Sequence, residues 1–93
     1  MRLEWLPSAI ADRKAIFEYI ARENPAAAIR VSRQIRTEVS HLADTPLIGR
    51  LGRVIGTREL VIRKYPYIAI YTANEQTIRI LRVLHGAQQW PPS

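Results

Sequence analysis

The chain has no cysteine, only two histidines and few acidic residues. The missing cysteine excludes disulfides and thiolate metal sites. With His41 and His85 alone, a zinc site would have to rely on carboxylates, so we expect no metal and no other cofactor. No apolar run approaches the roughly 20 residues that span a bilayer, and the amino terminus lacks the build of a signal peptide. We therefore expect a cytoplasmic protein with no membrane partner.

The positive charge of the chain is unevenly distributed. Its 93 residues predict one domain, 1–93, large enough to bury a core. Residues 1–48 contain seven Lys or Arg and six Asp or Glu, whereas residues 49–93 contain seven and two. Almost all of the net charge of +6 therefore belongs to the second half. A basic surface on so small a domain favours a polyanionic partner, either nucleic acid or an acidic protein segment.

Arginine dominates the cations, with twelve Arg against two Lys. Its fork binds phosphate and carboxylate in a bidentate way. Some arginines lie on predicted helices, where a GC-rich genome explains them as well as function does: Arg22, Arg30, Arg33 and Arg36. The stronger candidates for contact with a target all lie in the second half. They are the cations Arg58, Arg63, Lys64 and Arg82, together with His85 and Trp90.

The first half of the sequence predicts a strand and two helices. Arg2–Leu6 is a short strand, with Leu3 and Trp5 on one face. Ser8 can cap a first helix, whose loose apolar stripe is Ile10, Ile16, Phe17 and Ile20. Asn24 and Pro25 suit the start of a second helix, whose stripe is Ala28, Val31, Ile35, Val39 and Leu42. The short connection predicts an antiparallel helical hairpin.

The second half predicts a meander of three strands. The glycine-rich stretch 47–56 is interpreted as a loop, and Arg58–Arg63 alternates as a half-buried strand. Tyr67–Tyr71 is almost wholly apolar, which indicates a strand covered on both faces. Thr77–Leu84 is the last strand, followed by a tail over residues 88–92. The predicted class is α+β, with a helical hairpin on an antiparallel sheet in the order β-α-α-β-β-β.

Several motifs, in order, resemble the RelE/ParE superfamily of toxins from bacterial type II toxin–antitoxin systems. They are Tyr19-Ile20-Ala21 with Asn24-Pro25-Ala26-Ala27-Ala28, Gly56-Thr57-Arg58-Glu59-Leu60-Val61, Tyr65-Pro66-Tyr67-Ile68-Ala69-Ile70-Tyr71, and Ile80-Leu81-Arg82-Val83-Leu84-His85-Gly86 before Trp90-Pro91. The resemblance covers nearly the whole chain. It implies a small basic toxin held inactive in a hetero-oligomer with a cognate antitoxin.

The end of the last strand favours one branch of this superfamily. Its ribosome-dependent ribonucleases typically have a His-Arg-Arg-like group there, followed by Val-Tyr. This chain has His85-Gly86-Ala87 and then Gln88-Gln89-Trp90, so glycine and alanine fill the two arginine positions. The chain therefore resembles the ParE branch more closely, whose known target is DNA gyrase. The alternatives are a ribonuclease that cuts messenger RNA on the ribosome, and a non-toxic member that acts only with its antitoxin.

If the chain were a ribonuclease, its active site would have few candidates. Cleavage needs an acid, a base and cations for the phosphorane charge. His85 is the one plausible acid or base, Arg58 or Arg82 can hold the charge, and Tyr67 can stack a base. Against this, an isolated histidine at a strand end more often bonds to the backbone.

Arg82 interrupts an otherwise aliphatic strand, and a buried arginine needs a partner. Either it pairs internally with Glu59, or it contacts acidic groups of the target or antitoxin. An antitoxin helix and strand would fit a groove beside the hairpin and an open sheet edge. The expected antitoxin contacts are Ile16, Ile20, Arg63 and Arg82. We expect Trp90 to pack back onto the sheet.

Overall fold

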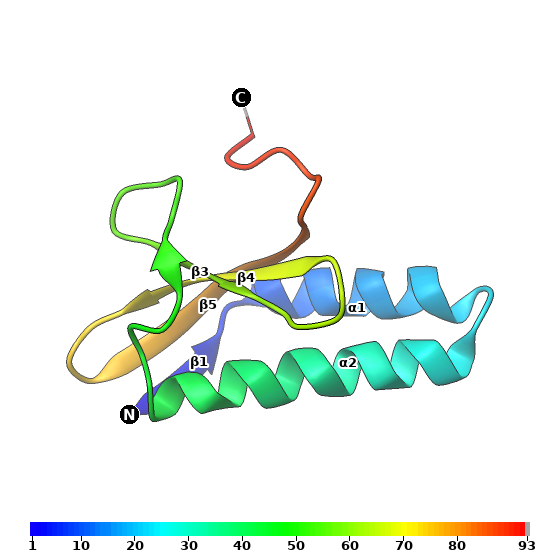
Figure 1. Ribbon diagram of the computed structural model, residues 1–93, viewed down its shortest axis with the longest axis horizontal. Helices are drawn as coiled ribbons and strands as arrows, with labels where there is room; N and C mark the ends of the chain where they lie inside the picture. The colour runs from blue at the N-terminus through cyan, green and yellow to red at the C-terminus, as the bar shows by residue number, and fades with distance from the viewer. Residues whose placement is uncertain (93) are drawn as a thin grey trace.

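The computed structural model describes residues 1–92 as a helical hairpin packed on one face of a single sheet (Figure 1). The elements are β1 (Arg2–Trp5), α1 (Pro7–Ala21), α2 (Pro25–Ser40), the 3-10 helix η1 (His41–Ala43), β2 (Arg50–Leu51), β3 (Arg58–Val61), β4 (Tyr67–Ala73) and β5 (Thr77–His85). The predicted α+β order is confirmed. Within the described residues, no helix is both long and apolar enough to cross a membrane.

The sheet has the strand order β1-β5-β4-β3-β2. Strands β3, β4 and β5 form the predicted antiparallel meander. The sheet as a whole is mixed, however, because β1 pairs in parallel with β5, Leu3 opposite Ile78 and Trp5 opposite Ile80. The expectation of a wholly antiparallel sheet was therefore wrong. The expected loop over residues 47–56 also contains β2, a strand of two residues that is too short to give a sequence signal.

The two helices begin in different ways. Asn24 caps α2 as predicted, since its side chain accepts a hydrogen bond of 3.0 Å from the amide of Ala27. The predicted Ser8 cap of α1 is wrong. Leu6 is the N-cap, Pro7 fills the first helical position, and no side chain caps the helix. The Ser8 hydroxyl instead donates a 2.6 Å hydrogen bond to the carbonyl of Leu81 in β5.

A large apolar cluster fills the space between the hairpin and the sheet. Helix α2 contributes the predicted stripe, which is buried throughout: Ala28, Val31, Ile35, Val39 and, just beyond the helix, Leu42. In α1 the stripe is different from the prediction, because Ile10 is 55% exposed and Phe17 38% exposed. Ala9 is buried instead, and Ile16 and Ile20 pack partly against the core.

The opposite face of the sheet has a smaller cluster, formed by Ile68, Ile70 and Leu84. Trp90 packs against this cluster, as expected for the tail. Figure 1 shows the tail and the loop after β2 on the side of the sheet away from the hairpin. The strand over Tyr67–Tyr71 is therefore buried on both faces, which confirms the prediction from its continuous apolar run.

Tyr71 joins the sheet to the segment that follows α2. Its ring is fully buried, its hydroxyl donates to the carbonyl of Pro46 at 2.8 Å, and it accepts from the amide of Gly49 at 2.9 Å. The ring lies so close to Gly49 that an added Cβ there would come within 2.6 Å of the hydroxyl. The hydroxyl thereby satisfies two backbone groups that no regular element pairs.

We expect Tyr71→Phe to lower the free energy of unfolding by about 1–3 kcal/mol, because it leaves the buried Gly49 amide and the half-buried Pro46 carbonyl unpaired. Urea unfolding followed by circular dichroism measures this. Tyr19→Phe is the matched control, since Tyr19 is 70% exposed. A Tyr71→Phe midpoint equal to that of the control would show that water replaces the hydroxyl at no cost.

Candidate functional site

Helix α1 takes the place of a strand along part of the edge of β5. Strand β1 pairs with β5 only as far as Ile80. Beyond that point Ser8 and Asp12, one helical turn apart, reach the edge. Ser8 bonds to the carbonyl of Leu81, and the Asp12 carboxylate accepts from the amide of Val83 at 2.9 Å. The edge is thus closed by side chains of a helix, which also fixes how the hairpin sits on the sheet.

Asp12 is also the partner of Arg82. The Arg82 Nε donates to Asp12 Oδ2 at 2.7 Å, and Nη2 donates to Oδ1 at 3.0 Å. The hydrogen bonds to Asp12 raise the pKa of Arg82, although partial burial opposes them. The sequence suggested that Arg82 pairs internally with Glu59, and this partner was wrong. Arg82 does form an internal pair, but with Asp12. A register shift between Ile70 and Tyr71 on the β4–β5 ladder accompanies this arrangement.

An open groove of about 520 Å³ lies beside this pair. Its lining comes from three elements and the tail: Asp12, Ala15, Ile16, Tyr19, Tyr67, Val83, His85 and Gln88. We call it the β5 groove. It combines an apolar floor with two tyrosines, a histidine and the Asp12–Arg82 pair at its border. Of the expected antitoxin contacts, it contains Ile16, while Ile20 is half-buried against the core.

His85 lies at the mouth of this groove. Its Nδ1 accepts a 3.1 Å hydrogen bond from the amide of Ala87, which is the backbone role expected of an isolated histidine. Its ring meets the ring of Tyr67 edge-on, with centroids 5.7 Å apart. Tyr67 is itself buried, and burial, followed by the neighbouring Tyr19, raises the pKa of its hydroxyl.

The candidate cations of the second half do not converge on one site. Arg58 lies opposite Tyr71 on β4, whereas His85 lies opposite Tyr67. Four residues along a strand correspond to about 13 Å. The Arg58 guanidinium also donates to the carbonyls of Leu47 and Gly49, at the end of the sheet far from His85.

Arg63 and Lys64 lie at the other end, in the turn between β3 and β4. Arg63 pairs with Glu38 at 3.6 Å, but 78% of its side chain is exposed. Lys64 is exposed, has a left-handed backbone (φ 73°) and makes no ion pair with any described residue. The amide of Gly86 bonds to Pro66 in the same turn, so Arg63, Lys64 and His85 share one end of the sheet. Arg82 and Trp90 form a separate contact, with the guanidinium 5.7 Å from the indole ring.

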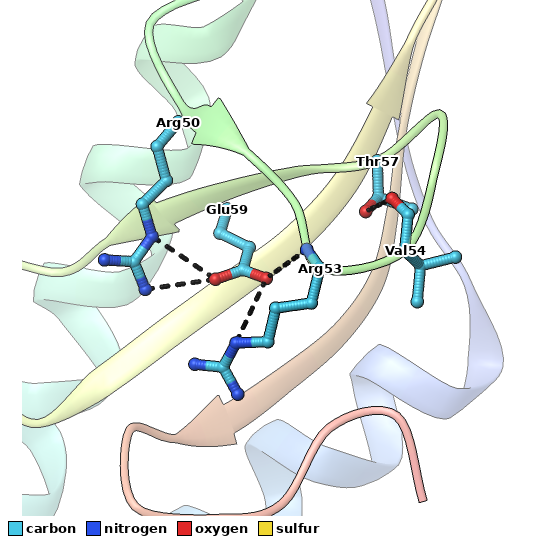
Figure 2. Close-up of polar contacts among 5 residues, drawn as sticks. All are labelled: Arg50, Arg53, Val54, Thr57 and Glu59. Carbon is cyan, nitrogen blue, oxygen red and sulfur yellow. Dashed lines mark hydrogen bonds and ion pairs between the residues drawn. The ribbon is translucent and has the colours of Figure 1, made fainter.

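A second polar cluster fixes the loop after β2 onto the sheet (Figure 2). Glu59 is only 2% exposed, and its Oε1 accepts from Arg50 Nη2 at 3.0 Å. Its Oε2 accepts from the backbone amide of Arg53 at 3.1 Å, and the Arg53 guanidinium lies 3.7 Å away. We call Arg50, Arg53 and Glu59 the Glu59 clamp. In the same loop the Thr57 hydroxyl donates to the carbonyl of Val54 at 2.6 Å.

The described residues provide no cluster of three histidine, aspartate or glutamate side chains that could hold a metal ion. The site therefore consists of two arginine–carboxylate contacts, an open groove and a basic end of the sheet. Such an arrangement offers surfaces for a protein partner. Of the arginines named as candidates for holding phosphate, Arg58 lies at the end of the sheet far from His85, and Arg82 is bound to Asp12.

Comparison with known proteins identifies the family of this chain. Residues 3–90 match the family described as "ParE toxin of type II toxin-antitoxin system, parDE". The chain belongs to the ParE toxin family. It is 42% identical to "Putative toxin Y4kP" of Sinorhizobium fredii (strain NBRC 101917 / NGR234), over 97% of this chain and 93% of the relative.

Two further similarities agree with this family. The chain is 36% identical to "Toxin RelE2" of Caulobacter vibrioides (strain ATCC 19089 / CIP 103742 / CB 15), over 90% of this chain and 93% of that one. The fold matches a chain of the structure "Chromosomal ParDE TA system from P. aeruginosa" with a TM-score of 0.83 and 28% identity. That match covers 91% of this chain and 95% of the other.

Sequence reasoning missed two parts of the site of this ParE toxin. Asp12 was not singled out, because it is one carboxylate on a helix and its partner Arg82 lies 70 residues away. The Glu59 clamp was missed because its arginines lie in a segment interpreted as a loop. The alternation of β3 did place Glu59 on the face opposite Leu60, so a buried glutamate next to two loop arginines was the available signal.

We expect Glu59→Gln to destabilise this ParE toxin by about 2–4 kcal/mol at pH 7, since a buried carboxylate with three donors is lost. Burial alone would raise the pKa of Glu59, but the Arg53 amide and the two guanidinium groups outweigh it and lower the pKa. Its contribution is therefore complete above the pKa of an unfolded glutamate, about 4.3, and is lost as pH falls through the folded pKa.

Urea unfolding at several pH values between 7 and 3 measures this effect. The difference between wild type and Glu59→Gln should shrink steadily as the pH falls below about 4.3. Glu23→Gln is the control, because Glu23 is exposed and pairs with no described residue. A difference that stays constant over the whole range would mean that shape, and not charge, accounts for the role of Glu59.

Proposed function

We propose that this protein is the toxin of a type II toxin–antitoxin pair and blocks DNA replication by binding DNA gyrase. Membership in the ParE family supports the toxin role. The observation that carries the choice of mechanism is that the residues proposed from the sequence for RNA cleavage are separated or already bonded within the protein. His85 has one ring nitrogen occupied by a backbone amide, Arg82 is held by Asp12, and Arg58 lies at the far end of the sheet.

The basic end of the sheet is our candidate for the target contact. Arg63, Lys64 and His85 lie together there and are exposed. Lys64 is the one cation of the sheet half without an internal hydrogen bond or ion pair among residues 1–92. A non-glycine residue with a positive φ carries backbone strain, and such strain is concentrated at functional sites. The Arg82–Trp90 contact borders this end of the molecule and is a second, less exposed candidate.

A cognate antitoxin is the second proposed partner. The structural relative is titled as a ParDE toxin–antitoxin system, which supports such a pair. The β5 groove suits an amphipathic antitoxin segment, because Ile16 and Tyr19 offer apolar contact and His85 and Gln88 offer polar contact. The antitoxin would thereby cover the mouth of the groove, next to the proposed target surface.

A ribosome-dependent ribonuclease is the alternative function. Tyr67 and His85 meet at the groove, and a base could stack on the exposed His85 ring there. Tyr67 is only 8% exposed, however, so most of its ring is covered by the protein. This weakens the role in base stacking that the sequence suggested for it.

Pulse labelling after tightly controlled induction distinguishes these functions. We expect thymidine incorporation to fall within the first minutes while methionine incorporation continues. His85→Ala should leave this order unchanged, and Lys64→Glu should weaken the inhibition at equal protein level, because it reverses an exposed charge with no internal partner. Glu75→Lys, at the β4–β5 turn, is the control for a charge change at a site away from this surface.

A fall in methionine incorporation first, abolished by His85→Ala, would replace gyrase binding by RNA cleavage. No fall in either incorporation, with folded protein present, would favour a member that acts only with its antitoxin. Supercoiling by purified gyrase in the presence of the toxin tests the target directly.

A further inference from the structure

The most exposed large apolar side chain among residues 1–92 is Ile55, which is 99% exposed. It lies in the loop after β2, on the side of the sheet away from the hairpin (Figure 1). We call residues 52–57 the Ile55 loop. The exposed apolar residues of the hairpin have a different setting, because they line two adjoining surface grooves between α1 and α2: Ile10, Phe17 and Ile29. A groove receives side chains of a partner, whereas a projecting side chain such as Ile55 can enter a pocket of one.

A tight turn places Ile55 at the tip of the loop. The amide of Thr57 donates to the carbonyl of Val54 at 3.1 Å, which closes a turn of four residues. Gly56 has a φ of 86°, the sign that a type II turn requires at its third position. A residue with a Cβ is strained there. Ile55 holds the second position of the turn, and its side chain points into solvent.

Hydrogen bonds within the loop hold this turn in place. The Gly52 amide donates to the Thr57 carbonyl at 2.8 Å, and the Thr57 hydroxyl donates to the Val54 carbonyl at 2.6 Å (Figure 2). A Cβ at Gly52 would collide with Thr57 Oγ1, so the two ends of the loop are in direct contact. The Glu59 clamp adds the bond to the Arg53 amide. A loop fixed in this way loses little conformational entropy when it binds.

We propose that Ile55 inserts into an apolar pocket of the target protein, DNA gyrase, and anchors the toxin there. The proposal rests on the proposed function and adds a contact outside the basic end of the sheet. In protein complexes a few anchors in desolvated pockets carry most of the affinity. Arg50 and Arg53 lie beside the loop, and their side chains are 54% and 43% exposed. We therefore expect carboxylates at the rim of the gyrase pocket.

The position of the loop favours the target over the antitoxin. A small pocket on the same face of the sheet brings Arg53 together with His85 and Trp90, so the loop borders both candidate target contacts. The β5 groove, our candidate for the antitoxin, lies beside α1. Strand β4 separates β5 from β3, which places the two strands about 10 Å apart. An antitoxin segment in the β5 groove would leave the Ile55 loop uncovered.

A protein pocket fits the loop better than a lipid surface does. Binding to a bilayer grows with the apolar area that is buried and with the cations that face anionic lipids. Here a single isoleucine projects from the turn, and the two neighbouring arginines already bind Glu59. A pocket surrounds one side chain on every side and removes all of it from water, so it gains most from this arrangement.

The test changes the tip and leaves the rest of the loop intact. Ile55→Ser removes the anchor, and Ile55→Leu keeps its volume and apolar character. Ile10→Ser is the matched control, because Ile10 is also exposed, at 55%, but lies on the hairpin. Supercoiling by purified gyrase is titrated with each toxin to find the concentration that gives half inhibition. Calorimetry with the antitoxin encoded beside the gene measures antitoxin affinity, and circular dichroism measures folding.

We expect Ile55→Ser to raise the half-inhibiting concentration about tenfold or more, because an isoleucine side chain is no longer removed from water on binding. Ile55→Leu should lose less than Ile55→Ser, since it conserves volume. Ile10→Ser should stay within about threefold of wild type. Folding and antitoxin affinity of Ile55→Ser should equal those of wild type, because Ile55 packs against little of the protein.

Several results would overturn the proposal. If Ile55→Ser inhibits gyrase as well as wild type does, the loop makes no target contact, while the inhibition itself leaves the proposed function standing. An equal loss in Ile10→Ser would mean that the effect is not specific to the loop. A loss of antitoxin affinity in Ile55→Ser would assign the loop to the antitoxin. Binding of wild type, but not Ile55→Ser, to phosphatidylglycerol vesicles would assign it to a lipid surface. If wild type does not inhibit gyrase, the proposed function fails, and the assignment of the loop fails with it.

Discussion

The fold depends on how one carboxylate, Asp12, attaches α1 to the free edge of β5. It accepts hydrogen bonds from the Val83 amide and from two nitrogens of Arg82. The amide would otherwise be an unpaired edge group, and the half-buried guanidinium would otherwise lack a counterion. Because one residue satisfies both needs, the position of the hairpin on the sheet and the direction of the Arg82 side chain are fixed together. A charge reversal at Arg82 would consequently place two carboxylates side by side and test the fold before it tested any partner contact.

The distribution of charge illustrates why formal counts mislead in small proteins. The second half has an excess of five positive charges, yet its arginines hold β2, the loop after it, and the ends of the sheet in place. Each guanidinium so used has fewer free donors for a partner. Residues 1–48 have a nearly balanced count, but two of the three acids on α1 and α2, Asp12 and Glu38, are bound to arginines of the sheet half. Because these two carboxylates pair with arginines of the sheet half, the hairpin arginines have no ion pair among residues 1–92.

Much of the fold was predictable because it follows local rules. The Asn24-Pro25 start of α2, its buried stripe and the wholly buried β4 depend on spacing and capping, and all were confirmed. The stripe of α1 was not, since Ile10 and Phe17 have helical spacing but belong to a surface groove. Spacing shows that residues share a face without showing which face meets the core. Asp12 with Arg82 could not be predicted, because a pair so far apart in the sequence depends on the register of the completed sheet. Glu59 with Arg50 was missed because β2 was not predicted, although the position of Glu59 on β3 was a signal for it.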